Sequence, residues 1–268
     1  EVFCAPSNAV APAVQEGDAG VMAAYPAVIF DMFDTLVNFN NVHLPLVQVN
    51  GRDVRTTSPF VYEVLKPLCA GISFDAFFHA FVGSYRAAEE IRNRTQREVT
   101  ARERFGMLFE RLDLRDGPEV TGLVEAGIAE HMRQLGRAME FPESHRTVLD
   151  ALLPRYRMAV ISNFDHGPTV EQALRMHGIR DRFEVVLVSA DVGWRKPRPE
   201  IFAEAFRRMG IGPREAIFVG DSPEVDVLGA QTVGMDVIWI DNGTKALPPG
   251  TPAPTYTVSR FPEIAPLL

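Results

Sequence analysis

Five short hydrophobic runs divide the chain, and each has the form of a strand that is buried on both faces. They occupy residues 27–30, 158–161, 185–188, 216–219 and 237–240. Unbroken apolar runs of this length are typical of parallel strands, which helices cover on both sides. Helical patterns lie between the last four runs, and each starts beside a proline and stops before a glycine: residues 169–177, 199–209 and 223–233. This alternation predicts an α/β fold with a doubly wound parallel sheet and right-handed crossovers.

The stretch between the first two hydrophobic runs breaks this rhythm. Residues 47–54 alternate around Asn50-Gly51, a pair that favours a two-residue hairpin turn. Amphipathic helical patterns follow, at residues 59–69, 73–92, 100–112 and 118–136. The predicted organisation is therefore a core domain made of residues 21–36 and 141–268, with a helical domain inserted between them. We call residues 37–140 the inserted segment.

Composition narrows the possible functions. The 268-residue chain has a formal net charge of −8, so we expect neither nucleic acid nor an anionic membrane surface as a partner. No apolar run approaches the roughly 18 residues that a membrane helix needs. The two cysteines, Cys4 and Cys69, match no metal-binding spacing and indicate reduced thiols in a cytoplasmic protein. Nothing in the sequence indicates an oligomeric state.

The first 20 residues differ from the rest of the chain. They contain no Lys or Arg, and the first such residue is Arg52. A secretory signal needs a basic start and an unbroken apolar stretch, and Pro6 and Pro12 argue against one. We interpret residues 1–20 as a disordered extension or a gene-model artefact, and Met22 would be a natural start.

Polar residues follow the ends of four predicted strands. Asp31 ends the first, Ser162 the second and Asp221 the fourth, while Lys196 lies in the loop after the third. Asp226 stands five residues beyond Asp221. In a doubly wound sheet the ligand site lies at the carboxyl ends of the strands. Any one of these residues could be a turn or a helix cap, but four together predict a site.

These residues stand in motifs that resemble those of the haloacid dehalogenase (HAD) superfamily. Phe-Asp-Met-Phe-Asp-Thr-Leu at residues 30–36 resembles motif I, written DxDxT, and residues 160–163 resemble motif II. Residues 193–199, Gly-Trp-Arg-Lys-Pro-Arg-Pro, resemble motif III, and residues 220–226, Gly-Asp-Ser-Pro-Glu-Val-Asp, resemble motif IV. The order of the four motifs is that of the family. The resemblance implies a Rossmann-like core, and the inserted segment looks like the C1 helical cap of subfamily I.

The resemblance also implies an enzyme with an aspartate nucleophile and Mg²⁺. By family position, Asp31 would attack a phosphorus atom and form an aspartyl-phosphate, which splits one difficult step into two. The carboxylates of Asp31 and Asp221 and the backbone carbonyl of Phe33 would bind the ion. Asp226 would hold it directly or through water. Hard oxygen ligands of this kind suit Mg²⁺.

Three residues would bind the substrate, which the family implies to be a small anionic, phosphorylated metabolite. Lys196 would neutralise the nucleophile and the transferring group, and the Ser162 hydroxyl would donate to a phosphoryl oxygen. Asn163 follows Ser162 in motif II and would be the third substrate-binding residue. Catalysis would thus rest on Asp31, Ser162 and Lys196.

Phe33 departs from the phosphatase pattern. Phosphatases of the family carry a second aspartate two residues after the nucleophile, where its side chain shares a strand face with the nucleophile and protonates the leaving group. Such general acid catalysis contributes roughly 10²–10⁴-fold, and phenylalanine cannot supply it. Asp34 is either a turn residue or, if the strand end twists, a replacement acid.

The aromatic residue keeps two further functions open. Haloacid dehalogenases carry tyrosine at this place, and a halide leaves without a proton. Those enzymes need no metal and alter the acidic pair of motif IV, whereas Asp221 and Asp226 are both present here. Two unpaired carboxylates at one buried site would repel each other, so the pair favours a cation. Mg²⁺-dependent phosphatase chemistry is the favoured interpretation; a 2-haloacid dehalogenase-type hydrolase and a weakly active HAD-fold binding protein are the alternatives.

The inserted segment is rich in arginines that stand among the glutamates Glu89, Glu90, Glu98 and Glu103. Such charges usually form a solvated helix face, although one arginine could turn inward toward an anionic substrate. The sequence does not single one out from Arg86, Arg92, Arg94, Arg97, Arg102 and Arg104.

Overall fold

The computed structural model describes residues 25–115 and 117–268, so the predictions for residues 1–20, Met22 and Cys4 lie outside the described residues. Within this part, the centre is a six-stranded parallel sheet in the order β10-β9-β8-β1-β6-β7. Its strands are β1 (Ala27–Phe30), β6 (Arg157–Ser162), β7 (Val185–Val188), β8 (Ala216–Gly220), β9 (Asp236–Ile240) and β10 (Tyr256–Val258). The five predicted strands are confirmed. The edge strand β10 was not predicted because it has only three residues and none is fully buried.

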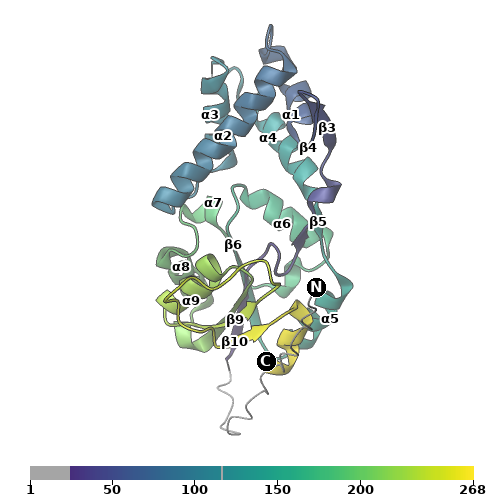
Figure 1. Cartoon of the computed structure of the whole chain (residues 1–268). Helices are drawn as coiled ribbons and strands as arrows, with labels where there is room; N and C mark the ends of the chain where they lie inside the picture. Colours follow the sequence, from purple (N-terminus) through teal and green to yellow (C-terminus); the bar gives the residue numbers. More distant parts are fainter. Residues whose placement is uncertain (1–24, 116) are drawn as a thin grey trace, which may run out of the picture.

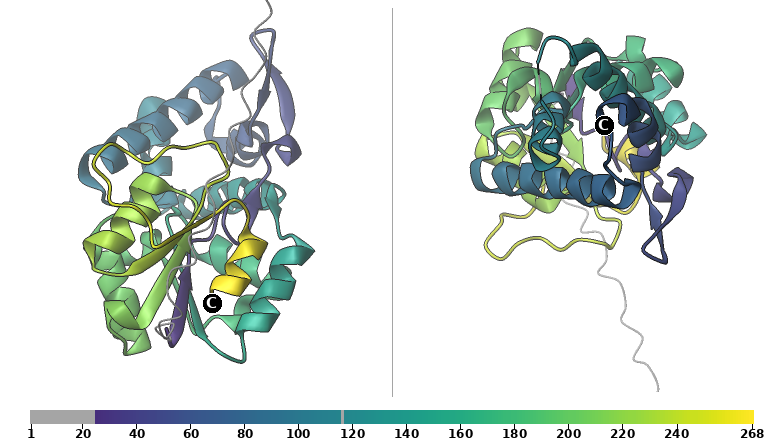
Figure 2. Two further views of the ribbon diagram at one scale, coloured as in Figure 1. Left: turned by 60° about the horizontal axis from the view of Figure 1, so that its bottom comes forward. Right: turned by 90° about the horizontal axis from the view of Figure 1, so that it is seen from above.

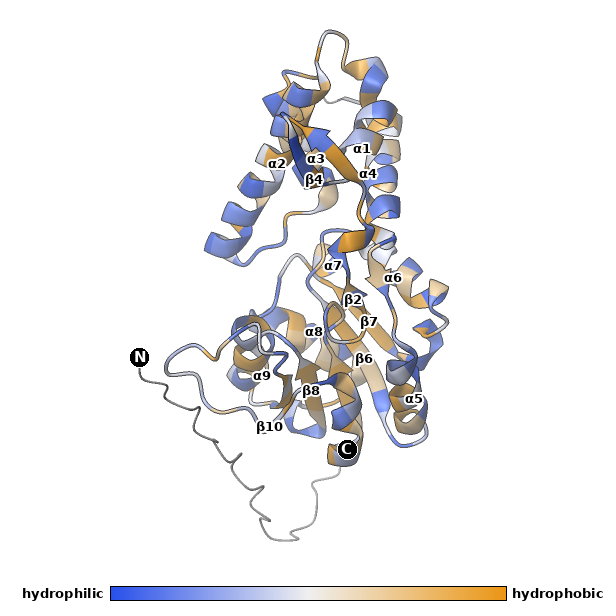
Figure 3. Ribbon diagram, turned by 45° about the vertical axis from the view of Figure 1, so that its right-hand side comes forward, coloured by the Kyte–Doolittle hydropathy of each residue, from blue (hydrophilic) through white to orange (hydrophobic). Residues whose placement is uncertain are grey.

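Helices cover both faces of this sheet, as the doubly wound pattern predicts. Because alternate side chains of a strand point to opposite faces, Val28 and Phe30 of β1 enter one core while Ala27 and Ile29 enter the other. The first core is closed by α5 (Glu143–Leu152), α6 (Gly167–Met176) and the 3₁₀ turn η6 (Phe261–Leu267), and the second by α8 (Pro199–Met209) and α9 (Leu228–Thr232). Figure 3 shows the apolar strands between helices of mixed hydropathy. The α/β fold class is confirmed.

The inserted segment lies at one end of the sheet (Figures 1 and 2, left). Its two ends meet where β2 (Asn38–Phe39) pairs antiparallel with β5 (Met139–Glu140). The predicted hairpin is present as β3 (Leu46–Val49) and β4 (Arg52–Arg55), and its turn residues Asn50 and Gly51 both have positive φ, at 49° and 72°. The described helices are α1 (Ser58–Leu65), α2 (Phe74–Thr95), α3 (Ala101–Arg111) and α4 (Thr121–Gly136).

These four helices have a hydrophobic core of their own. Leu65, Phe77, Phe105 and Val124, one from each helix, are fully buried in it. A capping box fixes the start of α3: the Thr100 side chain accepts from the Glu103 backbone, and the Glu103 carboxylate accepts from the Thr100 backbone. The helices therefore form a separate packed unit above the sheet edge.

No helix in the described part of the chain is both long enough and apolar enough to cross a membrane. Cys69 is buried with a free thiol.

Candidate active site

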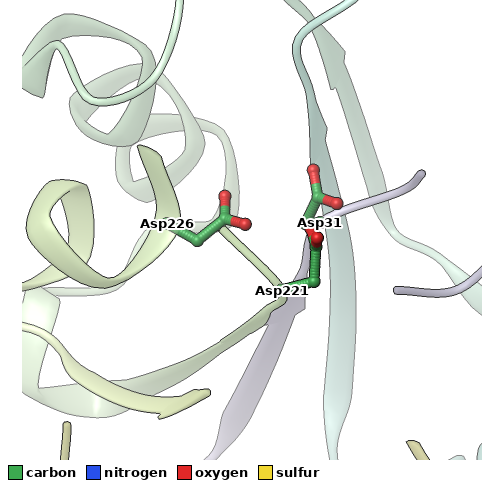
Figure 4. A group of neighbouring side chains, drawn as sticks. All are labelled: Asp31, Asp221 and Asp226. Carbon is green, nitrogen blue, oxygen red and sulfur yellow. The ribbon is translucent and has the colours of Figure 1, made fainter. Parts of the chain in front are cut away.

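Three carboxylates meet at the carboxyl edge of the sheet. β1 lies between β6 and β8, so Asp31 and Asp221, which follow β1 and β8, leave neighbouring strands at the same edge. The Asp31 backbone N–H donates to Val219 O at 2.8 Å and fixes the end of β1 against β8. Carboxylate oxygens of Asp31, Asp221 and Asp226 all lie within 4.8 Å of one another, and all three residues are buried (Figure 4).

Asp226 reaches this point because the chain after β8 does not start as an ordinary helix. The helix predicted at residues 223–233 begins instead with a π-helical turn, Pro223–Val227, and only then continues as α9. The Asp226 Oδ2 accepts from the Ser222 backbone N–H at 3.0 Å, which turns the side chain back toward the strand end. Wide turns of this kind are frequent at functional sites.

Lys196 is the buried cation of the cluster. Its Nζ lies 2.5 Å from Asp31 Oδ1 and 2.8 Å from Asp226 Oδ1. Burial disfavours the charged ammonium, but the two carboxylates outweigh burial and raise the pKa of Lys196. The lysine therefore stays protonated and lies between the first and last carboxylates of the cluster.

Two lysines, the buried Lys196 and the half-exposed Lys245, do not balance the three carboxylates. Burial raises the pKa of Asp31 to about 7, Lys196 opposes that rise, and Asp226 and Asp221 add to it. Burial is also the main cause of the raised pKa of Asp221, although Lys245 lowers it from 2.7 Å away. Carboxylates crowded in this way are stabilised by an added cation, and their hard oxygens are the ligands that Mg²⁺ prefers. The donor set therefore fits Mg²⁺.

Ser162 and Asn163, the two polar residues at the end of β6, differ in their hydrogen bonds. The Ser162 side chain is fully buried, and its Oγ has no hydrogen-bond partner among the described residues. The Asn163 side chain holds the loop after β7: its Nδ2 donates to Lys196 O at 2.9 Å and its Oδ1 accepts from Lys196 N at 2.8 Å. Asn163 therefore fixes the backbone of Lys196, whereas Ser162 keeps a free hydroxyl.

A hollow of about 510 Å³ opens between the inserted segment and this sheet edge. Asn163 and Phe164 line it from the core, and Arg92, Arg104 and His131 line it from α2, α3 and α4. Asn163 thus connects the hollow to the motif II strand and to Lys196. The location is suited to the part of a substrate that lies beyond the reacting group.

Phe33 packs against two aromatic residues that line this hollow. Its ring centroid is 5.0 Å from that of Phe164 and 6.1 Å from that of Phe39, and both of these neighbours line the hollow. A cluster of three aromatic rings, those of Phe33, Phe39 and Phe164, therefore lies beside the hollow.

Asp34 has the contacts of a turn residue. Its φ is 60°, a value that favours glycine, and its Oδ1 accepts from the Phe39 backbone N–H at 3.0 Å. It lines a different hollow, of about 460 Å³, together with Thr35 and Arg260. These contacts agree with the turn interpretation of Asp34.

Sequence reasoning missed two charged residues near the site. Lys245, in the proline-rich loop after β9, gave no signal beyond its charge. Glu98 looked like part of a solvated charged face, but the structure buries it, with Arg92 Nε at 2.8 Å and Arg195 Nη1 at 2.6 Å. The solvated-face interpretation is therefore wrong for Arg92 and Glu98, and also for Arg104, which is 1% exposed.

Comparison with known proteins decides the family. A family model for haloacid dehalogenase-like hydrolases matches residues 25–234. The chain is a haloacid dehalogenase-like hydrolase. This hydrolase is 35% identical over 143 residues to a glyceraldehyde 3-phosphate phosphatase of Pyrococcus furiosus, a match that covers 53% of the chain and 58% of the relative. It is 31% identical over 168 residues to the pyrimidine 5'-nucleotidase YjjG of Escherichia coli, covering 62% and 69%.

The chain therefore spans a little over half the length of the glyceraldehyde 3-phosphate phosphatases that it matches. Among solved structures, a 2-haloacid dehalogenase from Pseudomonas syringae pv. Tomato superposes with a TM-score of 0.66 at 22% identity, over 89% of this hydrolase and 95% of that chain. At that identity the likeness shows the fold alone.

Proposed function

We propose that this hydrolase is a Mg²⁺-dependent phosphatase that acts on a small phosphorylated metabolite. The observation that carries the proposal is the buried cluster of Asp31, Asp221 and Asp226, whose carboxylate oxygens lie within 4.8 Å of one another. The phosphatase names among the curated relatives, glyceraldehyde 3-phosphate phosphatase and phosphoserine phosphatase, agree with it. A cytoplasmic location belongs to the same proposal.

In the proposed reaction Asp31 is the nucleophile. One of its carboxylate oxygens forms a bond to phosphorus as the bond from phosphorus to the ester oxygen breaks, which gives an aspartyl-phosphate and the leaving oxyanion, which takes its proton from water. A water molecule then attacks the phosphorus, inorganic phosphate leaves, and the Asp31 carboxylate is restored. Lys196, 2.5 Å from Asp31 Oδ1, holds this carboxylate in place. It also offsets the charge that develops on the phosphoryl group.

Ser162 and Asn163 complete the phosphoryl site. The Ser162 hydroxyl lacks a partner among the described residues and can donate to a phosphoryl oxygen, which would remove the cost of leaving it unpaired. Asn163 keeps Lys196 in register through its two hydrogen bonds to the lysine backbone. Both roles are positional and do not require either side chain to change its protonation state.

Mg²⁺ would be held by the carboxylates of Asp31, Asp221 and Asp226, with the Phe33 backbone carbonyl as a further oxygen ligand. When bound, the ion supplies positive charge that lowers the cost of bringing a phosphate dianion against the Asp31 carboxylate. Residues 37–140 would act as the cap, because their helices close the far side of the 510 Å³ hollow.

A dehalogenase reaction remains the second candidate because of one residue. Phe33 places an aromatic ring where a phosphatase would carry its acid, and a halide needs no proton to leave. In that reaction Asp31 would attack carbon, displace the halide and form an ester, which water would then hydrolyse. The three clustered carboxylates favour the phosphatase instead, because a metal-free reaction would leave them unbalanced.

One panel assay distinguishes the two reactions. Release of phosphate is measured from aryl, acyl and alkyl phosphates, and release of chloride from 2-chloropropionate, each with Mg²⁺ and with EDTA. The nearly isosteric variant Asp31→Asn serves as the matched control. We expect phosphate release that requires both Mg²⁺ and Asp31. Chloride release that persists in EDTA would overturn the proposal in favour of the dehalogenase.

A further inference from the structure

Arg104 is a buried cation with unused hydrogen-bonding capacity. It lies on α3, lines the hollow between the inserted segment and the sheet, and is 1% exposed. Its Nε and Nη2 are both buried without a hydrogen-bond partner among the described residues. Leaving a buried donor without a hydrogen bond lowers stability, and more so for a charged group, so we look for a ligand that would bond to these two nitrogens.

The nearest carboxylate, that of Asp165, does not form a normal hydrogen bond with Arg104. Asp165 Oδ2 lies 3.5 Å from Arg104 Nε, too far for a normal hydrogen bond, and the same oxygen is 3.4 Å from Arg92 Nη2. Arg92 has two closer acidic partners, because Glu98 and Glu89 lie 2.8 and 2.5 Å from its nitrogens. Two arginines thus share Asp165, and among the described carboxylates Arg104 has only this long contact, so its Nε and Nη2 keep unused hydrogen-bonding capacity.

The geometry of the guanidinium defines the partner. Nε and Nη2 form one edge of the planar group, and their two parallel N–H bonds match the two oxygens of a carboxylate. The rings of Phe81 and Phe105 hold the guanidinium, with centroids 5.4 and 5.2 Å from its central carbon. The edge formed by Nε and Nη2 is therefore held in place before any ligand arrives, which lowers the ordering cost of binding.

We propose that Arg104 binds a carboxylate at the far end of the substrate, so that the preferred substrates are organic phosphates that also carry a carboxylate. This inference rests on the proposed phosphatase function, since it assumes that the phosphoryl group sits at Asp31 while the rest of the molecule fills the hollow. Arg104 is then a specificity-determining residue, and the phosphoryl chemistry at the sheet edge does not depend on it.

The first test measures binding without turnover. By calorimetry in Mg²⁺, a short series of ω-carboxyalkyl phosphonates is compared with the alkyl phosphonates of equal chain length. In the pair that binds most tightly, the carboxylated phosphonate should bind to the wild-type protein about 10- to 100-fold more tightly than its alkyl counterpart. This is the usual contribution of a charge-assisted hydrogen bond to affinity. Arg104→Met should abolish this difference, and Arg104→Lys, which keeps the charge but loses the fork, should retain only part of it.

Arg86 on the exposed face of α2 provides the matched control. Arg86→Met should leave the carboxylate preference unchanged. Equal binding of the paired phosphonates by the wild-type protein, or a preference that survives Arg104→Met, would overturn the inference, and the wild-type comparison stands even if a variant misfolds. Phosphate release from p-nitrophenyl phosphate, which has no carboxylate, reports on the phosphatase function separately, so the two failures are distinguishable.

Discussion

Phe33 offers the sharpest test of how leaving groups depart in this hydrolase. An alkoxide leaves badly without a proton, whereas a nitrophenolate or the carboxylate of an acyl phosphate leaves without help. Because Phe33 cannot donate a proton, turnover should be measurable with p-nitrophenyl phosphate or acetyl phosphate and very low with sugar phosphates. Replacing it with an acid, Phe33→Asp, should raise the rate on alkyl phosphates by about 10²-fold, the lower end of general acid catalysis, and change the aryl ester much less.

The same substitution should lower stability. Phe33 packs against the rings of Phe164 and Phe39, at 5.0 and 6.1 Å. Aromatic pairs of this kind contribute about 0.5–1.5 kcal/mol each beyond their buried area, so Phe33→Asp should lower the free energy of unfolding by about 1–3 kcal/mol. The new carboxylate also adds to the repulsion near Asp31 and Asp221, and saturating Mg²⁺ should relieve that part.

The assay is a plot of log rate against leaving-group pKa for the wild-type protein, Phe33→Asp and Phe33→Leu. The leucine variant is the control, because it removes the ring contacts without adding an acid. We expect a steep slope for the wild-type protein and for Phe33→Leu, and a flatter one for Phe33→Asp. A flat slope in the wild-type protein would refute the reasoning, because another group, such as Asp34 or a residue of the inserted segment, would then donate the proton.

Three further predictions test other parts of the site. Ser162→Ala should lower the rate of phosphate release by about 10²-fold, the usual loss for one donor to a developing charge, and an unchanged rate would remove Ser162 from the site. Lys245 pairs with Asp221 but its side chain is 46% exposed, so Lys245→Met should tighten Mg²⁺ binding by no more than about 5-fold in calorimetry; weaker binding would contradict this competition. Burial lowers the pKa of His131 well below its usual value, so the unfolded chain takes up the proton first and His131 costs stability as the pH falls below about 6.5. The free energy of unfolding of His131→Phe should therefore fall less steeply between neutral and mildly acidic pH, by at most about 1.4 kcal/mol per pH unit, and equal slopes would contradict the assignment.

Much of the fold could be predicted because its main signal is local. Unbroken apolar runs mark strands buried on both faces, and the prolines and glycines beside the helices mark their ends. β10 was not predicted because Tyr256–Val258 is short and lies at the sheet edge, where its residues are only partly buried and form no apolar run. The π-helical turn at Pro223–Val227 was not predicted because it differs from an ordinary helix start only in its backbone hydrogen bonds, which residue spacing does not reveal.

The candidate site was predictable to the extent that it depends on strand ends. Parallel strands bring their carboxyl ends to one edge, so Asp31, Asp221 and Lys196 meet there without further information. The burial of Arg104 and Glu98 depends on how α2 and α3 pack over the core, and a chain pattern of alternating charges looks the same whether the face is solvated or closed. The contact between Lys245 and Asp221 likewise depends on the path of a loop.

Trapping of the covalent intermediate tests the central claim most directly, namely that Asp31 attacks phosphorus beside Mg²⁺. The protein is mixed with acetyl phosphate and Mg²⁺, quenched in acid, reduced with borohydride and digested, and the peptide containing residue 31 is analysed by mass spectrometry. An aspartyl-phosphate is reduced to homoserine, so the account predicts homoserine at position 31 that requires Mg²⁺ and is absent in Asp31→Asn. Turnover of acetyl phosphate with no modification at position 31, or with homoserine at another aspartate, would contradict it.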